Sequence, residues 1–220
     1  MRSLKNPSEK YLEHLEYYKK MHEDGFSYRN GKSLNSSQTY NGQMTITYAK
    51  FIKNIIKKNN LNSILEYGCG KASFYEKEFI VANENYPSLK NYWGIDVKLY
   101  DPAVKKFSNM PSDKCDITIS IDVLEHIPEE DIDWVLEKIM KLSNKFIFLV
   151  VGSYTSEALL PNGEGAHILI KTAKWWFNKL VYFKKKFKDI KILCICIGKD
   201  KDNNLTHTPI EIDDKIKHYI

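Results

Sequence analysis

The chain has 220 residues, enough for one domain, and its formal net charge of +5 is too small to require a nucleic-acid partner. Hydrophobic residues make up 43% and charged residues 28%, as in soluble globular proteins. No apolar run approaches the ~18 residues of a membrane helix, and the N-terminal sequence lacks the apolar core of a signal peptide. The four cysteines show neither disulfide-scaffold density nor a paired zinc spacing. We therefore expect a cytoplasmic protein without membrane contact.

Two helical patterns open the chain. Apolar residues recur at helical spacing over residues 8–22, and a second apolar stripe follows "TITYAKFIKNIIKK". The stretch Asp24–Asn41 between them is polar and contains glycine. We expect residues 1–44 to form a helical cap or lid and residues 45–220 to form the main domain.

From residue 62 short apolar runs alternate with helical patterns. The expected strands are "NSILEY", "NYWGID" ending at Asp96, "CDITISIDV" ending at Asp122, and "KFIFLVV". The expected helices lie near 72–80 and over "EEDIDWVLEKIMKLS" and "TAKWWFNKLVYFKKKF", where Trp175 and Trp176 are interpreted as packing residues.

The C-terminal part predicts an antiparallel hairpin, because a turn-rich segment separates "DIKILCICIG" from "THTPIEID". Alternation in the first of these strands places Cys194 and Cys196 on one buried face. The whole pattern predicts an α/β fold with a doubly wound, mostly parallel, Rossmann-like sheet. The stretch Val97–Lys114 is short for a further helix and strand, which predicts a trimmed sheet edge after the second strand.

The first strand runs into a glycine turn in "SILEYGCGKASFYE". Glycines at the carboxyl end of a strand in such sheets allow close approach of a ligand to the backbone. The turn lacks the third glycine of a dinucleotide site, where Ser73 stands, and it is not a P-loop. Glu66 opposes a pyrophosphate but suits a cationic ligand such as S-adenosylmethionine. The positive charge of Lys71 weakens this argument in part, although its long side chain can point to solvent.

Further acidic residues follow the next two expected strands. Asp96 can accept hydrogen bonds from both hydroxyls of a ribose, a feature that NAD-binding proteins share, or it can cap a helix. In "SIDVLEHIPEED", Asp122 follows the third strand and borders the crevice or caps the turn, and Glu125 is interpreted as structural.

The motifs "ILEYGCGKA", "YWGIDV" and "IDVLEHIPEE", in this order, resemble class I S-adenosylmethionine-dependent methyltransferases of the small-molecule type. The resemblance covers residues 45–200 and implies a seven-stranded Rossmann-like sheet, with S-adenosylmethionine as cofactor, S-adenosylhomocysteine as product and no metal. Ala72 stands where the family often has a third glycine, and the acidic contact to the adenine amino group is open between Asp101 and Asp113. The resemblance implies that the methionine part of the cofactor borders Glu66, Gly68, Cys69 and Gly70. It further implies that Asp96 binds the ribose, that Val97 lies against the adenine, and that Asp122 lies near the sulfonium end.

Histidines supply the candidates for catalysis and substrate binding. His126 is either a general base for the methyl acceptor or a histidine packed in a turn. His167, in the loop "GEGAHILIK", is a candidate substrate contact or a loop residue without such a role. His22, Tyr28 and Arg29 lie in the segment where the family often builds a substrate lid, and packing or surface roles are their alternatives.

The expected reaction is in-line transfer of a methyl group to an O, N, S or C nucleophile of a small molecule. One alternative is a nucleic-acid methyltransferase, for which a basic face around the pocket mouth and strongly salt-dependent binding would argue. The other is a non-catalytic S-adenosylmethionine-binding protein with a closed acceptor pocket. The residues specify neither the acceptor nor the oligomeric state.

Overall fold

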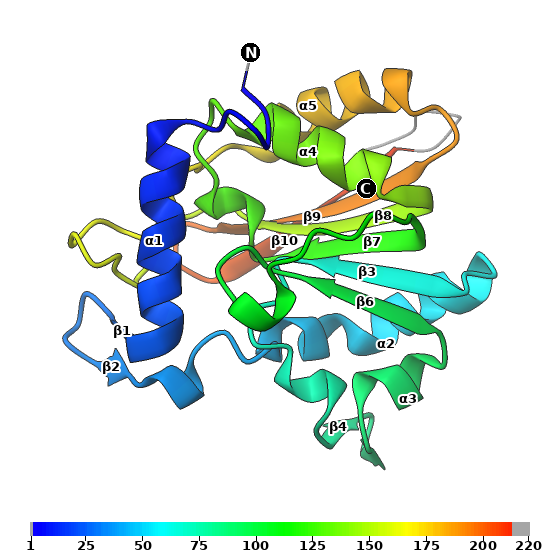
Figure 1. Cartoon of the computed structure of the whole chain (residues 1–220), viewed down its shortest axis with the longest axis horizontal. Coiled ribbons are helices and arrows are strands. Elements are labelled where there is room, and N and C mark those ends of the chain that lie inside the picture. Colours follow the sequence, from blue (N-terminus) through cyan, green and yellow to red (C-terminus); the bar gives the residue numbers. More distant parts are fainter. Residues whose placement is uncertain (1, 213–220) are drawn as a thin grey trace.

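The computed structural model describes residues 2–212, and its centre is a six-stranded sheet with the strand order β10-β9-β8-β7-β3-β6. All neighbouring strands are parallel except β9 and β10, which form an antiparallel pair. Helices α4 and α5 cover one face of the sheet, and α2 and α3 cover the other (Figure 1). The predicted α/β class, the mostly parallel sheet and the C-terminal hairpin are confirmed.

The elements have the following bounds. The strands of the central sheet are β3 (Ser63–Tyr67), β6 (Asp96–Tyr100), β7 (Cys115–Ile121), β8 (Ser143–Gly152), β9 (Lys191–Lys199) and β10 (Leu205–Ile212). Two small hairpins pair β1 (Phe26–Ser27) with β2 (Ser33–Leu34) and β4 (Phe79–Val81) with β5 (Glu84–Tyr86). The helices are α1 (Glu9–Asp24), α2 (Gln43–Lys58), α3 (Leu89–Trp93), α4 (Ile132–Lys141) and α5 (Ala173–Lys186). Short 3-10 turns are η1 (Ser36–Gln38), η2 (Ser73–Tyr75), η3 (Lys105–Phe107) and η4 (Leu124–His126).

The central strands are apolar on both sides because both faces of the sheet are covered. In β8, Ile147 and Leu149 pack with α4 and α5, whereas Phe148 packs toward α2. Successive side chains of a strand point to opposite faces, so one apolar run serves two cores. Cys194 and Cys196 both lie in the core under α4 and α5, which confirms their predicted shared face.

The expected strand ending at Asp96 is wrong, because β6 begins at this residue. Residues 89–93 form the short helix α3, and Gly94 ends it with a left-handed φ of +68°. The chain then enters β6, in which Asp96 pairs with Ser63 at the amino end of β3. Asp96 is exposed there, and the acidic residue that follows β6 at its carboxyl end is Asp101.

The expected helix near residues 72–80 is also absent from the structure. The turn η2 and the β4–β5 hairpin take its place. Ala72 adopts a positive φ that does not fit a helix, and Phe79 pairs with Tyr86 across the hairpin, whose turn is formed by Ala82 and Asn83. Strand β6 forms the edge of the sheet, and the segment from residue 101 to 114 adds only η3. The sheet thus has six strands over the described residues, against the seven that the resemblance implies.

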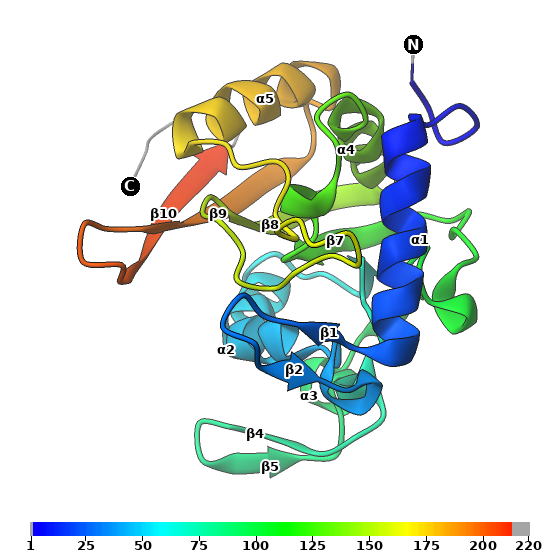
Figure 2. The ribbon, with the colours of Figure 1, turned by 90° about the vertical axis from the view of Figure 1, so that its left-hand side faces the viewer.

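Helix α1 runs across the carboxyl edge of the parallel strands, together with the β1–β2 hairpin and the loop after β8 (Figures 1 and 2). Its first turn is fixed by Asp131, which is fully buried. Asp131 accepts hydrogen bonds from the backbone N–H of Ser8 at 3.1 Å, from the Ser8 hydroxyl, and from Trp134 Nε1 at 2.7 Å. No helix within the described residues is long and apolar enough to cross a membrane.

We predict that Asp131→Ala detaches the start of α1. The substitution leaves the buried N–H groups of Ser8 and Trp134 without their acceptor, at a cost of about 3 kcal/mol of unfolding free energy. Asp133→Ala is the matched control in the same helix turn, because the Asp133 side chain is 61% exposed and forms only a surface ion pair with Lys179. Urea unfolding of both variants checks this, and equal losses of stability would contradict it.

Candidate functional site

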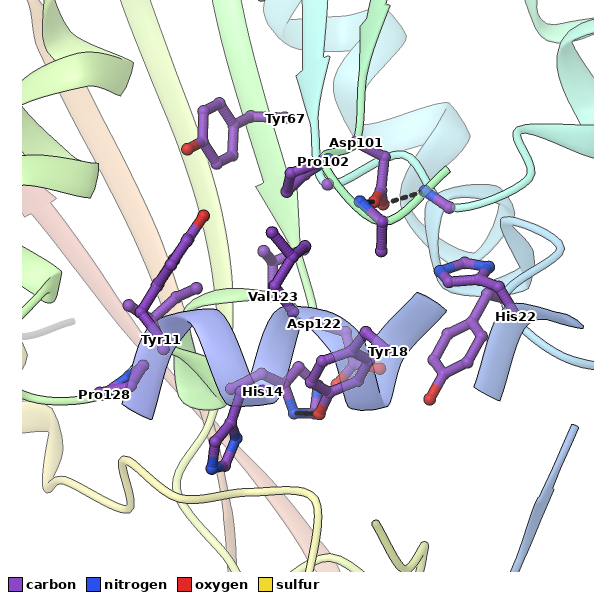
Figure 3. Close-up of a pocket in the computed structure, with 17 residues that line it drawn as sticks. Tyr11, His14, Tyr18, His22, Tyr67, Asp101, Pro102, Asp122, Val123 and Pro128 are labelled. Carbon is purple, nitrogen blue, oxygen red and sulfur yellow. Dashed lines mark hydrogen bonds between the residues drawn. The ribbon is translucent and has the colours of Figure 1, made fainter. Parts of the chain in front are cut away.

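Two adjoining pockets lie at the carboxyl edge of the sheet and together form one crevice. The four residues that line both pockets are Tyr40, Gly68, Gly70 and Asp122. The first, which we call the α1 pocket, opens between α1 and the ends of β6 and β7 (Figure 3), and its lining includes Tyr11, Tyr18, Asp101, Pro102, Val123 and Ile127. The second, the α2 pocket, opens toward the start of α2, and its lining includes Tyr28, Gln43, Thr45, Glu66, Cys69 and Ile121.

The glycine turn lies between the pockets and is closely packed. Gly68 has a φ of +83°, and a Cβ added to it would overlap the side chain of Val123. Gly70 has a φ of +56°, and its added Cβ would lie 2.5 Å from the carbonyl oxygen of Tyr40. The N–H of Gly68 donates to the carbonyl of Tyr100 at 2.7 Å. Both glycines are therefore required by conformation and by space.

Asp101 connects the end of β6 to this turn. Its carboxylate accepts hydrogen bonds from the N–H of Gly70 at 2.8 Å and from the N–H of Ala103 at 2.9 Å (Figure 3). Burial raises the pKa of Asp101, and these N–H donors act against the rise. Of the two acidic residues that flank β6, Asp101 is therefore the one at the carboxyl edge of the sheet. Asp96, which the sequence suggested, lies at the opposite end of the strand.

Glu66 lies at the floor of the α2 pocket and is almost fully buried. Its two carboxylate oxygens accept hydrogen bonds from the hydroxyl of Thr45 and, at 2.6 Å, from the hydroxyl of Tyr75. Burial raises the pKa of Glu66 to about 7, although both hydroxyls act to lower it. Near neutral pH this group is thus partly protonated, and its anionic charge is weaker than its place in the sequence suggests.

The side chain of Lys71 does not point to solvent, although the sequence allowed that orientation. Its Nζ donates hydrogen bonds to the carbonyl of Ser36 and, at 3.2 Å, to the hydroxyl of Thr39. The lysine therefore joins the glycine turn to the N-terminal segment, and it lines neither pocket.

Asp122 and the two candidate histidines converge beside the crevice. Asp122 directly follows β7 and has a φ of +59°, and the ring centroids of His126 and His167 lie 5.0 Å apart. Nδ1 of His126 lies 2.9 Å from the carbonyl oxygen of Ala166 and 2.8 Å from the hydroxyl of Tyr18. Desolvation among these packed groups lowers the pKa of His126 to about 4, although part of the residue remains accessible. His126 is therefore a neutral imidazole near neutral pH.

Glu125 holds this region together. It is fully buried, and its Oε1 accepts a hydrogen bond from the N–H of Gly152 at the end of β8. Its backbone carbonyl accepts from the N–H groups of Ile168 and Leu169, both at 2.9 Å. Burial, followed by the charge of Asp122, raises the pKa of Glu125 well above its usual value. These contacts agree with the structural role expected for Glu125.

The remaining candidates divide between the crevice and other places. His22 lines the α1 pocket and packs on Tyr40 with a centroid distance of 4.4 Å. Arg29 lines neither pocket, and its Nε donates to the carbonyl of Ser156 at 3.4 Å. Val97 lines neither pocket, because it pairs with Ile64 near the amino end of the sheet. The expected contact of Val97 with the adenine therefore does not fit its position in the structure.

Sequence reasoning missed the aromatic lining of the α1 pocket. Tyr11 and Tyr18 lie seven positions apart on α1, and their spacing is the signal that both face the same side of a helix. Asp101 was considered only for an adenine contact. Pro102 directly after it marks the end of a strand, since proline cannot donate a ladder hydrogen bond.

No protein-family model matches the chain, and no curated protein shows a significant sequence match to it. The chain is an α/β protein with a crevice at the carboxyl edge of a mostly parallel sheet, which is the place where such sheets bind ligands. Its function has to be inferred from the chemistry of that site.

We predict that Gly68→Ala is much more damaging than Gly31→Ala. Both glycines have a φ of +83°, so both alanine variants carry the same backbone strain. Only the Cβ at position 68 collides with Val123, whereas nothing lies within 4 Å of the Cβ at position 31. In thermal unfolding, Gly68→Ala is expected to lose about 1–3 kcal/mol more of the free energy of unfolding than Gly31→Ala does. Equal losses would refute the packing of this turn.

We predict that Glu66→Gln changes the pH dependence of stability. The folded pKa of about 7 exceeds the usual 4.5, so the folded state binds this proton more tightly. Stability from this group is therefore present at low pH and is lost as the pH rises from 4.5 to 7. A glutamine side chain has no such titration, and the neighbouring hydroxyls can donate to it or accept from it.

At pH 8 the free energy of unfolding of Glu66→Gln is expected to exceed that of the parent chain by about 3 kcal/mol. This difference should vanish near pH 4. Chemical denaturation across this pH range measures it. Glu76→Gln is the control, because Glu76 is exposed and pairs at the surface with Lys106. A difference between Glu66→Gln and the parent that does not vary with pH would show that burial does not perturb Glu66.

Proposed function

We propose that this chain is an S-adenosylmethionine-dependent methyltransferase that acts on a small molecule. The observation that carries the proposal is the convergence of the glycine turn, Asp101 and Asp122 on one crevice at the carboxyl edge. These are the places where doubly wound sheets bind nucleotide-like ligands. The order of the three sequence motifs supports the same ligand.

The charge of the crevice favours a cationic ligand over a diphosphate. Carboxyl groups of Glu66, Asp101 and Asp122 line the two pockets. Among the described residues that line them, none is a lysine or arginine, the usual partners of phosphate. A ligand with an ammonium and a sulfonium group and no phosphate fits this lining, whereas the pyrophosphate of a dinucleotide would meet negative charge. The same lining argues against a nucleic-acid substrate.

The two pockets offer different surroundings for the two halves of such a ligand. Apolar side chains of Pro102, Val123 and Ile127 in the α1 pocket suit a planar base, and Asp101 keeps unused lone pairs that can accept from ribose hydroxyls. In the α2 pocket, Glu66 suits the amino-acid end. Asp122 borders both pockets and would lie beside the sulfonium between them.

The methyl donor, when bound, supplies a carbon already activated by the positive sulfur. The chain then has to align the acceptor and exclude water. The N-terminal segment supports this, because Tyr11 and Tyr18 of α1 and Tyr40, which precedes α2, line the α1 pocket. Nε2 of the neutral His126 can take a proton from an acceptor, or it can bind a cation that takes over this task.

We predict that Asp101→Ala weakens binding of S-adenosylmethionine and S-adenosylhomocysteine at least tenfold, which corresponds to roughly 1.4 kcal/mol or more, because charge-assisted hydrogen bonds to the ribose are lost. Asp96→Ala is the matched control, since Asp96 is exposed at the opposite end of the same strand, and it should leave binding unchanged. Isothermal titration calorimetry on folded variants measures both effects.

Asp101→Asn separates loss of charge from loss of the Gly70 contact. It retains one acceptor oxygen, so an intermediate affinity is expected. A parent chain that binds NAD but not S-adenosylmethionine would overturn the proposal. Loss of binding in Asp96→Ala with retention in Asp101→Ala would overturn the assignment of the ribose site.

A further inference from the structure

Three side chains able to bind a metal meet beside the crevice, although they come from separate segments. Asp122 directly follows β7, His126 lies in η4, and His167 comes from the loop after β8. One potential ligand atom of each lies within 4.8 Å of the other two, and all three residues are partly exposed. Donors that share one ion at about 2.1 Å lie roughly 3–4 Å apart, so small side-chain rotations would complete the site.

The hydrogen bonds of the two histidines assign their tautomers. Nδ1 of His126 lies 2.9 Å from the Ala166 carbonyl, and Nδ1 of His167 lies 2.7 Å from the Tyr154 carbonyl. A carbonyl oxygen only accepts, so each Nδ1 carries the proton. Each Nε2 therefore presents a lone pair. A histidine whose other N–H donates to a backbone carbonyl is the usual arrangement of a metal ligand.

The surroundings keep these ligands in place. A Cβ added to Gly152 would lie 2.7 Å from Cε1 of His167 and 2.8 Å from Oε1 of Glu125, so this glycine leaves the space that His167 occupies. Oε2 of Glu125 is buried and has no hydrogen-bond donor among the described residues. Asp122 adopts a positive φ, a strained conformation that is common at functional sites.

We propose that Asp122, His126 and His167 bind a divalent transition-metal ion such as Mn²⁺, Co²⁺ or Zn²⁺. Two imidazole nitrogens and one carboxylate suit these ions better than Mg²⁺ or Ca²⁺, which prefer oxygen ligands alone. Three protein ligands leave coordination positions open for water or substrate. The sequence and the family resemblance predicted no metal, so this site comes from the three-dimensional arrangement.

The position of the ion has a consequence that rests on the proposed function. Asp122 borders both pockets, so the ion would lie close to the place proposed for the sulfonium group, from which the methyl group would be transferred. An open coordination position would bind a hydroxyl oxygen and lower its pKa. The favoured acceptor is then a hydroxyl-bearing small molecule, whose proton would pass to solvent water because His126 acts as a ligand instead of a general base. The oxygen held at the ion would form the new bond to the methyl carbon as the bond from that carbon to sulfur breaks, which would leave S-adenosylhomocysteine.

The test measures metal binding directly, without a methylation assay. The full chain is freed of metal with a chelator and dialysed against Mn²⁺, Co²⁺ or Zn²⁺, and bound ion is counted. We expect one ion per chain, with a Co²⁺ absorption spectrum that reports nitrogen and oxygen ligands. His167→Gln and Asp122→Asn should each weaken binding at least tenfold. His207→Gln is the control, because His207 is exposed on β10, and it should bind as the parent chain does.

Failure to bind any of the three ions would overturn the proposal, and so would unchanged binding in both His167→Gln and Asp122→Asn. Thermal unfolding without metal establishes that each variant folds. If Asp122→Asn does not fold, His167→Gln decides, because His167 lies on a partly exposed loop. S-Adenosylmethionine binding by the metal-free chain is measured separately. Its absence, with metal binding intact, refutes the proposed function and leaves the metal site standing.

Discussion

The hydrogen bond from the Gly70 N–H to the carboxylate of Asp101 is the contact on which the crevice depends. It joins the turn after β3 to the end of β6, so the two strand ends present one continuous surface. Gly68 packs on Val123 after β7, which adds the third strand end to the same surface. The crevice is therefore a product of the parallel sheet, because only parallel strands bring three such ends to one edge.

The N-terminal segment converts this edge into an enclosed site. Asp131 fixes the start of α1, and Lys71 holds the segment around Ser36 against the glycine turn. Tyr11 and Tyr18 of α1 line the same pocket as Asp101 and Asp122. Side chains that exclude water lower the effective dielectric constant, so the charged groups of the lining would interact more strongly with a bound ligand. The lining carries acidic side chains and, among the described residues, no lysine or arginine, and we propose that it therefore favours a positively charged ligand.

Sequence reasoning reached the fold class because β7 and β8 are strongly apolar and the hairpin has a clear turn. It failed at β6, where "NYWGIDVKLYDP" contains two acidic residues that can follow a strand. Gly94 could not be recognised as the end of a helix of only five residues. The sequence pattern therefore indicated Asp96, in place of Asp101, as the carboxylate that follows the strand. The pairing of His126 with His167 was also out of reach, because it depends on how the loop after β8 returns to the Glu125 carbonyl. His126 itself was found, since it directly follows the end of β7.

We propose above all that the crevice binds a positively charged adenosine derivative across the glycine turn. A crystal structure of the chain with S-adenosylmethionine tests this most directly. We expect density for the ribose at Asp101, for the sulfonium beside Asp122 and for the amino-acid end toward Glu66. Density for the ligand outside the two pockets, or a phosphate group bound against residues 66–70, would contradict it.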